Sequence, residues 1–233
     1  MDKHYLICLI SDNNIEFIKK GILEIQNIDD SDLLIVDDGS EYDIIEEIKD
    51  YAFVKCIIHE LPLGYGSCLE TAFAYARDME YKYLITLNPE TAGVVKDVPA
   101  IMDNLKYGYD IVSCSRTLEN YSHDSLDKNL LEIYEVISEE LNSAADLNIT
   151  DPLSENKGYN LEMINDFELT EDGHGVLLQV FIQGAYFGSN IIEIPSDAGL
   201  PFGDEIYEYE NPIEELSAVI ETEKFLYNKG TIN

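Results

Sequence analysis

The sequence predicts an α/β fold in which a mostly parallel sheet is covered by helices on both faces. In the first half of the chain, apolar runs of strand length alternate with segments whose apolar residues recur at helical spacing. The apolar runs are nearly continuous, which is typical of strands buried on both faces of a parallel sheet. With 45% hydrophobic residues, the 233-residue chain can bury a core of this kind, so a disordered chain is not expected.

The expected strands of the first half have polar residues at or just after their downstream ends. Parallel strands place their carboxyl ends at one edge of a sheet, where ligands bind in such folds, so these residues should meet in one cleft. The five strands are expected at 5–10, 33–38, 53–58, 83–87 and 110–115. The polar residues at their ends are Ser11 and Asp12, Asp37 and Asp38, His59, Asn88 and Glu90, and Ser115 and Arg116.

Helices are expected between these strands and through most of the second half. Residues 14–26 carry four isoleucines on one helical face, and residues 125–145 form a longer acidic helix with an apolar stripe. A helix over 211–230 has Pro212 near its start and Gly230 beyond its last turn, which are typical boundary residues. The other expected helices lie at 44–48, 66–80 and 175–188, a strand is expected at 190–195, and a loop at 151–160.

Acidic residues dominate the composition. The 47 Asp and Glu against 14 Lys and Arg leave a formal net charge of −33, and residues 118–233 hold 25 of the acids, four lysines and no arginine. Such a chain should repel nucleic acid and anionic membrane surfaces, so neither is expected as a partner. A solvated acidic surface accounts for the charge more simply than mimicry of DNA does.

The cysteines and the hydropathy pattern indicate a cytoplasmic protein. None of the four cysteines forms a C-x-x-C pair, which favours small buried hydrophobes in a reducing compartment over disulfides or zinc ligands. His59 and His174 are likewise expected to be structural or solvated. The N-terminal segment is too short and too acidic for a signal peptide. The longest uncharged run, 174–192, contains glycines and glutamines, which favours a buried helix and strand over a membrane span.

Five motifs occur in order along the chain. They are "LLIVDDGS" at 33–40, "HELPLGYGSCLETAFAYA" at 59–76, "DIVSCSRT" at 110–117, "DPLSENKGYN" at 151–160 and "GVLLQVFIQGAYFGSNIIEIP" at 175–195. Together they resemble the family-2 glycosyltransferases of the GT-A fold, and within that family the dolichol-phosphate mannose synthases and their polyprenyl-phosphate relatives. The resemblance covers roughly residues 5–203 and implies a Rossmann-like sheet in a single domain over 1–233, with a nucleotide-binding half at 1–117 and an acceptor half at 118–233.

The resemblance implies transfer of a hexose from a nucleotide-diphosphate sugar, with inversion at the anomeric carbon. An acid at the end of the second strand can accept a hydrogen bond from a base N–H, as Asp37 or Asp38 would, although one of them could instead cap the next helix. Gly64 and Gly66 could let backbone approach a ligand at a helix start, or could form an ordinary tight turn. The residues expected to bind the nucleotide are Asp12, Asp37, Asp38, Gly64, Gly66 and Arg116.

The segment Asn88-Pro89-Glu90 stands where the resemblance implies an Asp-x-Asp metal site. Mg²⁺ or Mn²⁺ bound there would offset charge on the departing nucleotide. Glu90 can ligate a hard cation and the Asn88 oxygen can do so weakly, so weak metal binding is expected. The segment Glu171–Asp172 could hold a general base for a hydroxyl acceptor, with Asp172 as the candidate catalytic residue, or could simply begin a helix.

Further departures from the family pattern replace charged residues, most of which bind phosphate. The replacements are Asn14, Tyr65, Glu70, Asn160 and Leu200, and Glu205 follows the last glycine motif. Each lost charged hydrogen bond to phosphate forfeits roughly 1.5–3 kcal/mol. Two interpretations therefore stay open: an active glycosyltransferase with weak donor binding, or a catalytically impaired relative that acts as a binding or regulatory module.

Overall fold

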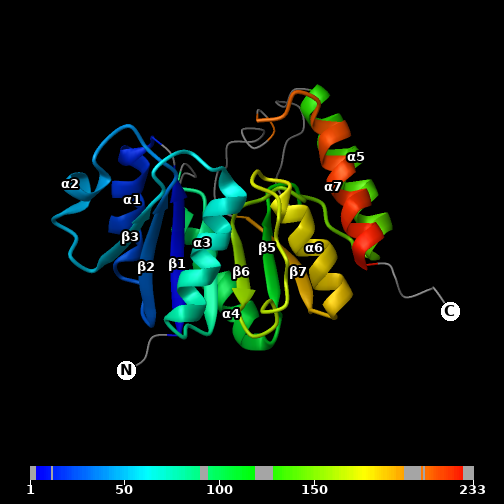
Figure 1. Cartoon of the computed structure of the whole chain (residues 1–233). Coiled ribbons are helices and arrows are strands. Elements are labelled where there is room, and N and C mark those ends of the chain that lie inside the picture. The colour runs from blue at the N-terminus through cyan, green and yellow to red at the C-terminus, as the bar shows by residue number, and fades with distance from the viewer. Residues whose placement is uncertain are drawn as a thin grey trace.

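The structure is a computed structural model that describes residues 4–11, 13–89, 94–118, 128–196, 206 and 208–227. Within these residues, seven strands form one sheet in the order β3-β2-β1-β4-β6-β5-β7 (Figure 1). The strands are β1 Tyr5–Ser11, β2 Ser31–Asp37, β3 Val54–Ile58, β4 Tyr83–Leu87, β5 Ile111–Ser115, β6 Lys157–Asn160 and β7 Ile191–Pro195. The helices are α1 Ile15–Ile25, α2 Ile44–Ile48, α3 Tyr65–Asp78, the short 3₁₀ helix η1 Val94–Asp97, α4 Val98–Tyr107, α5 Lys128–Ala145, α6 Val176–Phe187 and α7 Pro212–Tyr227.

The sheet is mostly parallel, as the sequence predicts. β1 pairs in parallel with β2 and β4, β2 pairs in parallel with β3, and β5 pairs in parallel with β7. β6 is the exception, because it runs antiparallel between β4 and β5. Helices cover both faces of the sheet, so the predicted α/β fold is confirmed.

The predicted loop over 151–160 is wrong in its last four residues, which form β6. The segment "KGYN" has no apolar alternation that would predict a strand. It is a strand because it fills the space between β4 and β5, and tertiary packing overrides its weak local preference. A Cβ added at Gly158 would stand 2.3 Å from the side chain of Ile101, so α4 packs directly on this strand. Helix α4 is also absent from the helices that the sequence predicts.

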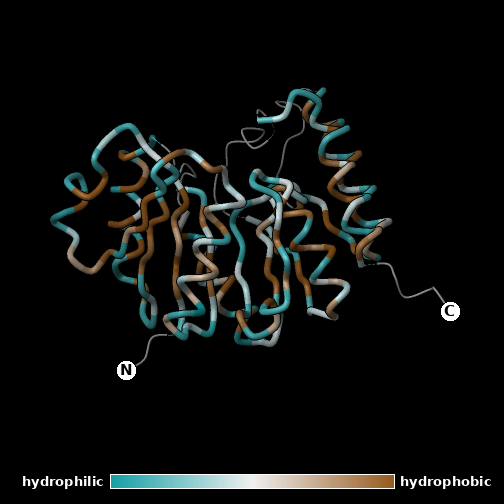
Figure 2. Tube along the Cα trace, in the orientation of Figure 1, coloured by the Kyte–Doolittle hydropathy of each residue, from teal (hydrophilic) through white to brown (hydrophobic). Residues whose placement is uncertain are grey.

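Different helices cover the two faces of the sheet. Alternate residues of β1 point to opposite faces, so Ile7 and Leu9 pack with α1, α2 and α4, whereas Leu6 and Cys8 pack with α3 and α6. In Figure 1, α3 and α6 cross the near face of the sheet and α4 lies behind it. β1 and β2 are hydrophobic along most of their length (Figure 2), because side chains on both faces are buried. Each fully buried aliphatic side chain stabilises the fold by about 1.5–3 kcal/mol relative to exposure.

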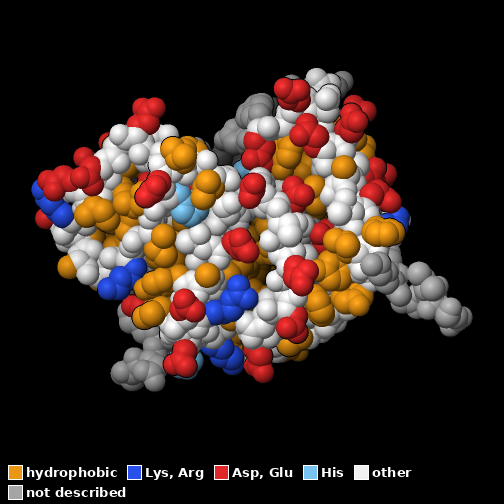
Figure 3. Space-filling model, viewed as in Figure 1, with side chains coloured by type: hydrophobic (Ala, Val, Ile, Leu, Met, Phe, Trp, Pro, Cys, Tyr) orange, Lys and Arg blue, Asp and Glu red, His pale blue; other side chains and the backbone are white. Residues whose placement is uncertain are grey.

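In the acidic second part of the chain, α5 and α7 pack on α6 through a third apolar cluster. The cluster buries Ile137 and Leu141 of α5, Phe181 of α6, and Leu216 and Ile220 of α7. The apolar stripe predicted for the long acidic helix therefore faces α6 and α7. Acidic side chains outnumber basic ones over the face shown in Figure 3. Among the described helices, none combines the length and the hydropathy needed to cross a membrane.

Candidate functional site

Most of the predicted site residues lie at one edge of the sheet. The carboxyl ends of β1, β2, β4 and β5 share this edge, the upper one in Figure 1, which brings together Asp37, Asp38, Asn88 and Arg116. Because β6 runs the other way, the residues that precede it also lie here, and Glu155 is one of them. Of the other predicted residues, Asp12, Glu90, Leu200 and Glu205 lie outside the described residues, so their roles stay predictions.

The two aspartates that follow β2 make internal hydrogen bonds. Asp37 is 1% exposed and accepts hydrogen bonds from the amide and the hydroxyl of Ser40, so it caps the turn after the strand. Asp38 accepts hydrogen bonds from the amides of Leu63 and Gly64 at 2.9 and 2.7 Å. Burial alone would raise the pKa of Asp38, but hydrogen bonds from Leu63, His59 and Gly64 hold it below its ordinary value. Binding of a nucleotide by either aspartate stays a prediction.

The glycines at the start of α3 make room for the chain's own backbone. Gly64 has φ +97°, and a Cβ there would stand 2.4 Å from the carbonyl oxygen of Asp172. A Cβ on Gly66 would stand 1.9 Å from the carbonyl oxygen of Glu171, and the Gly66 amide donates a hydrogen bond to the Asp172 carbonyl at 2.6 Å. The 171–172 segment therefore occupies the close approach that was expected for a ligand. A nucleotide contact from these glycines stays a prediction.

The segment 171–172 presents two carboxylates beside the start of α3. Asp172 is exposed, and its Oδ1 accepts a hydrogen bond from the hydroxyl of Ser67 at 3.0 Å. Glu171 is half-buried, and burial together with the charges of Glu223, Asp172 and Glu208 raises its pKa. A carboxylate whose pKa is raised toward neutrality suits proton transfer. The structure thus supplies two carboxylates where the sequence predicts a general base.

Buried glutamines fix the segment that leads to Asp172. Gln179 accepts hydrogen bonds from the amides of Thr170 and Glu171 at 2.9 and 3.0 Å. The side-chain nitrogens of Gln179 and Gln183 donate to the two oxygens of Glu223, which is 1% exposed. The sequence analysis missed this network, although two glutamines one turn apart in an apolar helix were a visible signal. Helix α7 therefore positions the candidate base through Glu223.

Arg116 is already paired with a carboxylate. Its Nε and one terminal nitrogen donate to the two oxygens of Asp151 at 2.6 and 2.7 Å, and its backbone amide donates to the same carboxylate at 2.9 Å. The two side chains are 5% and 0% exposed. The Arg116 guanidinium also lies 5.5 Å from the ring centroid of Tyr134. This bidentate pair neutralises the cation that was predicted to attract a diphosphate, and that role stays a prediction.

His174 is the centre of a charged network at the same edge. Its Nε2 lies 3.1 Å from Glu155 and its Nδ1 lies 3.0 Å from Glu208. Burial alone would lower its pKa, but the hydrogen bonds and the negative charges of Glu155 and Glu208 raise the pKa of His174 to about 10. The ring stacks on Tyr65 with centroids 4.6 Å apart. His174 is thus a cation at neutral pH, which sequence reading cannot reveal because both carboxylates are distant in the chain.

Asn88 belongs to the same network, because its side chain contacts the Glu155 carboxylate. Its side-chain nitrogen donates to Glu155 at 3.2 Å, and its backbone amide donates to the side-chain oxygen of Asn156 at 2.8 Å. Glu155 is therefore an acid adjacent to the predicted metal ligand; it lies in the 151–160 motif but was not itself predicted as a site residue. Carboxylate and amide oxygens are the donors that Mg²⁺ and Mn²⁺ prefer.

The His174 network predicts a loss of stability on mild alkalinisation. A pKa raised from 6.5 to about 10 on folding gives stability that is fully present below pH 6.5 and is lost as the pH rises toward 10. From pH 6.5 to 8, the unfolding free energy, measured by urea titration, should fall by up to about 2 kcal/mol because of this residue. Above pH 8 the buried Lys157, whose pKa burial lowers to about 8, acts in the opposite direction.

His174→Gln should remove this slope between pH 6.5 and 8. The exposed His4 provides the matched control, and His4→Gln should keep the slope of the wild type. Equal slopes in the wild type and in His174→Gln would contradict a charged His174.

Comparison with known proteins identifies relatives of both sequence and fold. The model of the family described as Glycosyl transferase family 2 matches residues 7–167, which is more than half of the chain. None of the curated proteins compared matches the chain significantly.

Three solved structures with the same fold hold a nucleotide or a nucleotide sugar. Glucosyl-3-phosphoglycerate synthase from Mycobacterium tuberculosis in complex with UDP is similar with a TM-score of 0.71 at 16% identity, covering 96% of this chain and 80% of that one. The same synthase with Mn²⁺, UDP-glucose and phosphoglyceric acid gives a TM-score of 0.70 at 15% identity, with the same coverage. A mannosyltransferase from Pyrobaculum calidifontis in complex with GDP-mannose and Mn²⁺ gives 0.59 at 12% identity, covering 96% of this chain and 69% of that one. At these identities the likeness shows the GT-A fold.

Proposed function

Because this chain belongs to glycosyl transferase family 2, we propose that it transfers a hexose from a nucleotide-diphosphate sugar to a hydroxyl acceptor, with inversion at the anomeric carbon. One observation carries the proposal: a connected set of polar groups at the carboxyl edge of the sheet. Asn88 and His174 share the Glu155 carboxylate, and the start of α3 holds Asp172 beside them. A single domain over 1–233 carries this activity, and the transferred sugar is a hexose, as the resemblance to dolichol-phosphate mannose synthases implies.

We place the nucleotide at the part of the carboxyl edge that β1, β2 and the start of α3 form. Asp37 and Asp38 are the proposed partners of the base, with Asp12, Gly64, Gly66 and Arg116 completing the predicted set. UDP and UDP-glucose in the structures of the synthase, and GDP-mannose in that of the mannosyltransferase, support a nucleotide-diphosphate sugar as the donor. They leave the base and the sugar open.

A divalent cation fits the oxygen donors at the end of β4. The Glu155 carboxylate would hold Mg²⁺ or Mn²⁺ together with the Asn88 oxygen once the Asn88 amide turns, because its nitrogen now faces Glu155, and Glu90 is the predicted third ligand. When bound, the cation would offset negative charge on the diphosphate. Mn²⁺ in structures of the synthase and of the mannosyltransferase supports this assignment.

Asp172 is the proposed general base. It is exposed, so an acceptor hydroxyl can reach it, and Ser67 orients its carboxylate. As the acceptor oxygen attacks the anomeric carbon, the bond from that carbon to the diphosphate oxygen breaks, the nucleoside diphosphate leaves, and Asp172 takes the hydroxyl proton, which contributes typically about 10²–10⁴-fold to the rate. Glu223 acts through Gln179 as a positioning residue for the segment that carries Asp172.

One observation favours the alternative of a catalytically impaired relative. Arg116 is paired with Asp151, so the Asp151 carboxylate already balances the positive charge that was predicted to attract phosphate. Tyr65 and Asn160 stand where the family has basic residues. In this alternative the chain binds a partner or a ligand through the same fold and transfers nothing.

Calorimetry with UDP- and GDP-sugars decides between the two. We expect dissociation constants in the millimolar range without metal and binding at least about tenfold tighter with Mn²⁺, since a cation must balance the diphosphate against local carboxylates. Glu155→Gln, which keeps the size of the side chain, should remove the gain from Mn²⁺, and the exposed Glu16→Gln should keep it. Micromolar binding in the presence of a chelator would contradict the metal site. Binding without any release of nucleotide across a panel of hydroxyl acceptors would favour the impaired relative.

A further inference from the structure

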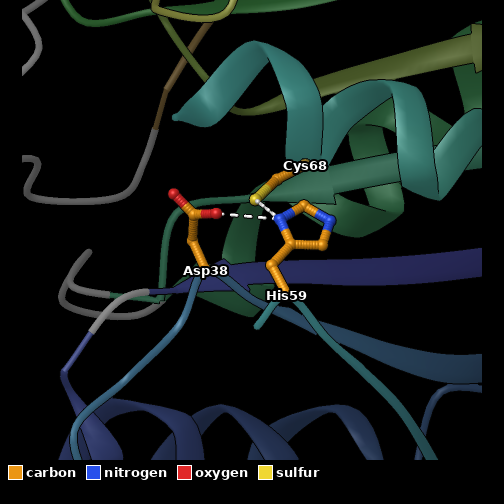
Figure 4. Close-up of side chains that lie close together, drawn as sticks. All are labelled: Asp38, His59 and Cys68. Carbon is orange, nitrogen blue, oxygen red and sulfur yellow. Dashed lines mark hydrogen bonds and ion pairs between the residues drawn. The ribbon is translucent and has the colours of Figure 1, made fainter. Parts of the chain in front are cut away.

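Three side chains with different chemistry converge at the carboxyl edge of the sheet. Asp38 follows β2, His59 follows β3, and Cys68 lies in the first turns of α3. The Nδ1 of His59 lies 2.8 Å from Oδ1 of Asp38 and 3.6 Å from Sγ of Cys68. Figure 4 shows all three side chains pointing toward one another, with the same ring nitrogen of His59 at the centre of both contacts. One ligand atom from each residue falls within 4.8 Å of the others.

We propose that Asp38, His59 and Cys68 form a binding site for Zn²⁺. Tetrahedral zinc with ordinary Zn–N and Zn–S bonds places its nitrogen and sulfur ligands about 3.5 Å apart. The observed separation of Nδ1 and Sγ, 3.6 Å, already matches this value. The oxygen of Asp38 would have to move away from Nδ1 by a few tenths of an ångström, a shift within the reach of side-chain rotation. A water molecule would complete the fourth position.

The surroundings of the three residues hold them in place for a metal. The side chains of His59 and Asp38 are 10% and 11% exposed, and Cys68 is fully buried. The second ring nitrogen of His59 lies 3.0 Å from the hydroxyl of Thr71, and the amides of Leu63 and Gly64 hold the Asp38 carboxylate. Hydrogen bonds of this kind orient metal ligands and fix the histidine tautomer.

The donor set selects the metal. A thiolate and an imidazole favour Zn²⁺ or Co²⁺, whereas Mg²⁺ and Mn²⁺ prefer oxygen donors such as those at Asn88 and Glu155. The proposed site is therefore distinct from the cation site at the end of β4. It differs from the expectation that none of the cysteines ligates zinc, because Cys68 finds its partners through the fold and not through a C-x-x-C spacing.

Metal binding requires one proton to leave and another to move. The Cys68 thiol releases its proton to solvent on binding zinc through sulfur. Zinc at Nδ1 requires the ring proton of His59 to be on the other ring nitrogen, where the Thr71 hydroxyl can accept a hydrogen bond from it, so a proton shared with Asp38 through Nδ1 has to move there. Burial and the charge of Asp38 raise the pKa of the Cys68 thiol without metal, so affinity should increase with pH.

The test is titration of the full chain, freed of metal by a chelator, with Zn²⁺ and Co²⁺ in the absence of nucleotide. We expect one equivalent of Zn²⁺ to bind, and Co²⁺ to show the charge-transfer absorption of a thiolate ligand. Cys68→Ser should abolish that absorption and weaken Zn²⁺ binding by more than about 100-fold, and Cys56→Ser, the control on β3, should change neither. Failure of nucleotide binding would leave these measurements unaffected, so the two proposals are tested separately.

A second variant keeps the test valid if Cys68→Ser does not fold. Thr71→Val leaves all three ligands in place and removes only the hydroxyl that faces His59, so it should weaken Zn²⁺ binding by about 10–100-fold. Zinc binding that is equal in the wild type, Cys68→Ser and Thr71→Val would overturn the proposal. So would Co²⁺ bound without thiolate absorption.

Discussion

Asp151→Asn should lower the unfolding free energy by about 3–5 kcal/mol, because it leaves a buried cation without its partner. Asp151 is fully buried and accepts two side-chain hydrogen bonds from Arg116. Asparagine keeps the shape but removes the charge, and one of its two side-chain atoms becomes a donor facing the donors of Arg116. Lys157, which is also fully buried, loses the same neighbouring charge. Urea unfolding at pH 7 measures the effect.

The matched control is Asp166→Asn, an exposed aspartate after β6, which should change stability by less than about 0.5 kcal/mol. The variant Arg116→Lys tests whether Arg116 serves stability or donor binding, because lysine keeps the charge and loses the bidentate geometry. If the main role of Arg116 is the pair with Asp151, this variant loses stability while donor affinity changes little. A large loss of donor affinity at unchanged stability would assign Arg116 to phosphate instead.

Gly66→Ala should destabilise the protein by roughly 1–3 kcal/mol and reduce the proposed transferase activity by about 100-fold. In an exposed helix, the same change stabilises by about 1 kcal/mol. Here the added Cβ would stand 1.9 Å from the carbonyl oxygen of Glu171, which is backbone and cannot rotate away. The 171–172 segment must therefore move, and Asp172 moves with it. Thermal unfolding and nucleotide release with donor and acceptor measure the two effects.

Gly21→Ala is the control for a helical glycine. A Cβ at Gly21 would meet the end of the Leu9 side chain at 2.9 Å, a contact that a rotamer change can relieve. This variant should keep its activity and change stability by less than Gly66→Ala does. Full activity in Gly66→Ala would show that the position of the 171–172 segment does not matter for transfer.

The positions along the chain of six of the seven described strands, and of most described helices, could be predicted from the sequence. The runs at 5–10 and 83–87 correspond to β1 and β4 within one residue, and Leu69, Phe73 and Ala76 of α3 are buried as their spacing predicts. Such features follow from local periodicity, because a strand buried on both faces has to be apolar throughout. The position of Asp37, Asp38, Asn88 and Arg116 at one edge follows in turn from the parallel order of the strands.

Only the tertiary structure decided what these residues contact. Arg116 meets Asp151, Gly66 meets Glu171, and His174 lies between Glu155 and Glu208. These partners lie 19 or more residues apart in the chain, and no local pattern links them. The sequence by itself therefore determined the fold and the edge where chemistry can occur. The charge of His174, the pairing of Arg116 and the antiparallel β6 depend on burial and on long-range contacts, whose electrostatic and packing energies exist only once the chain has folded.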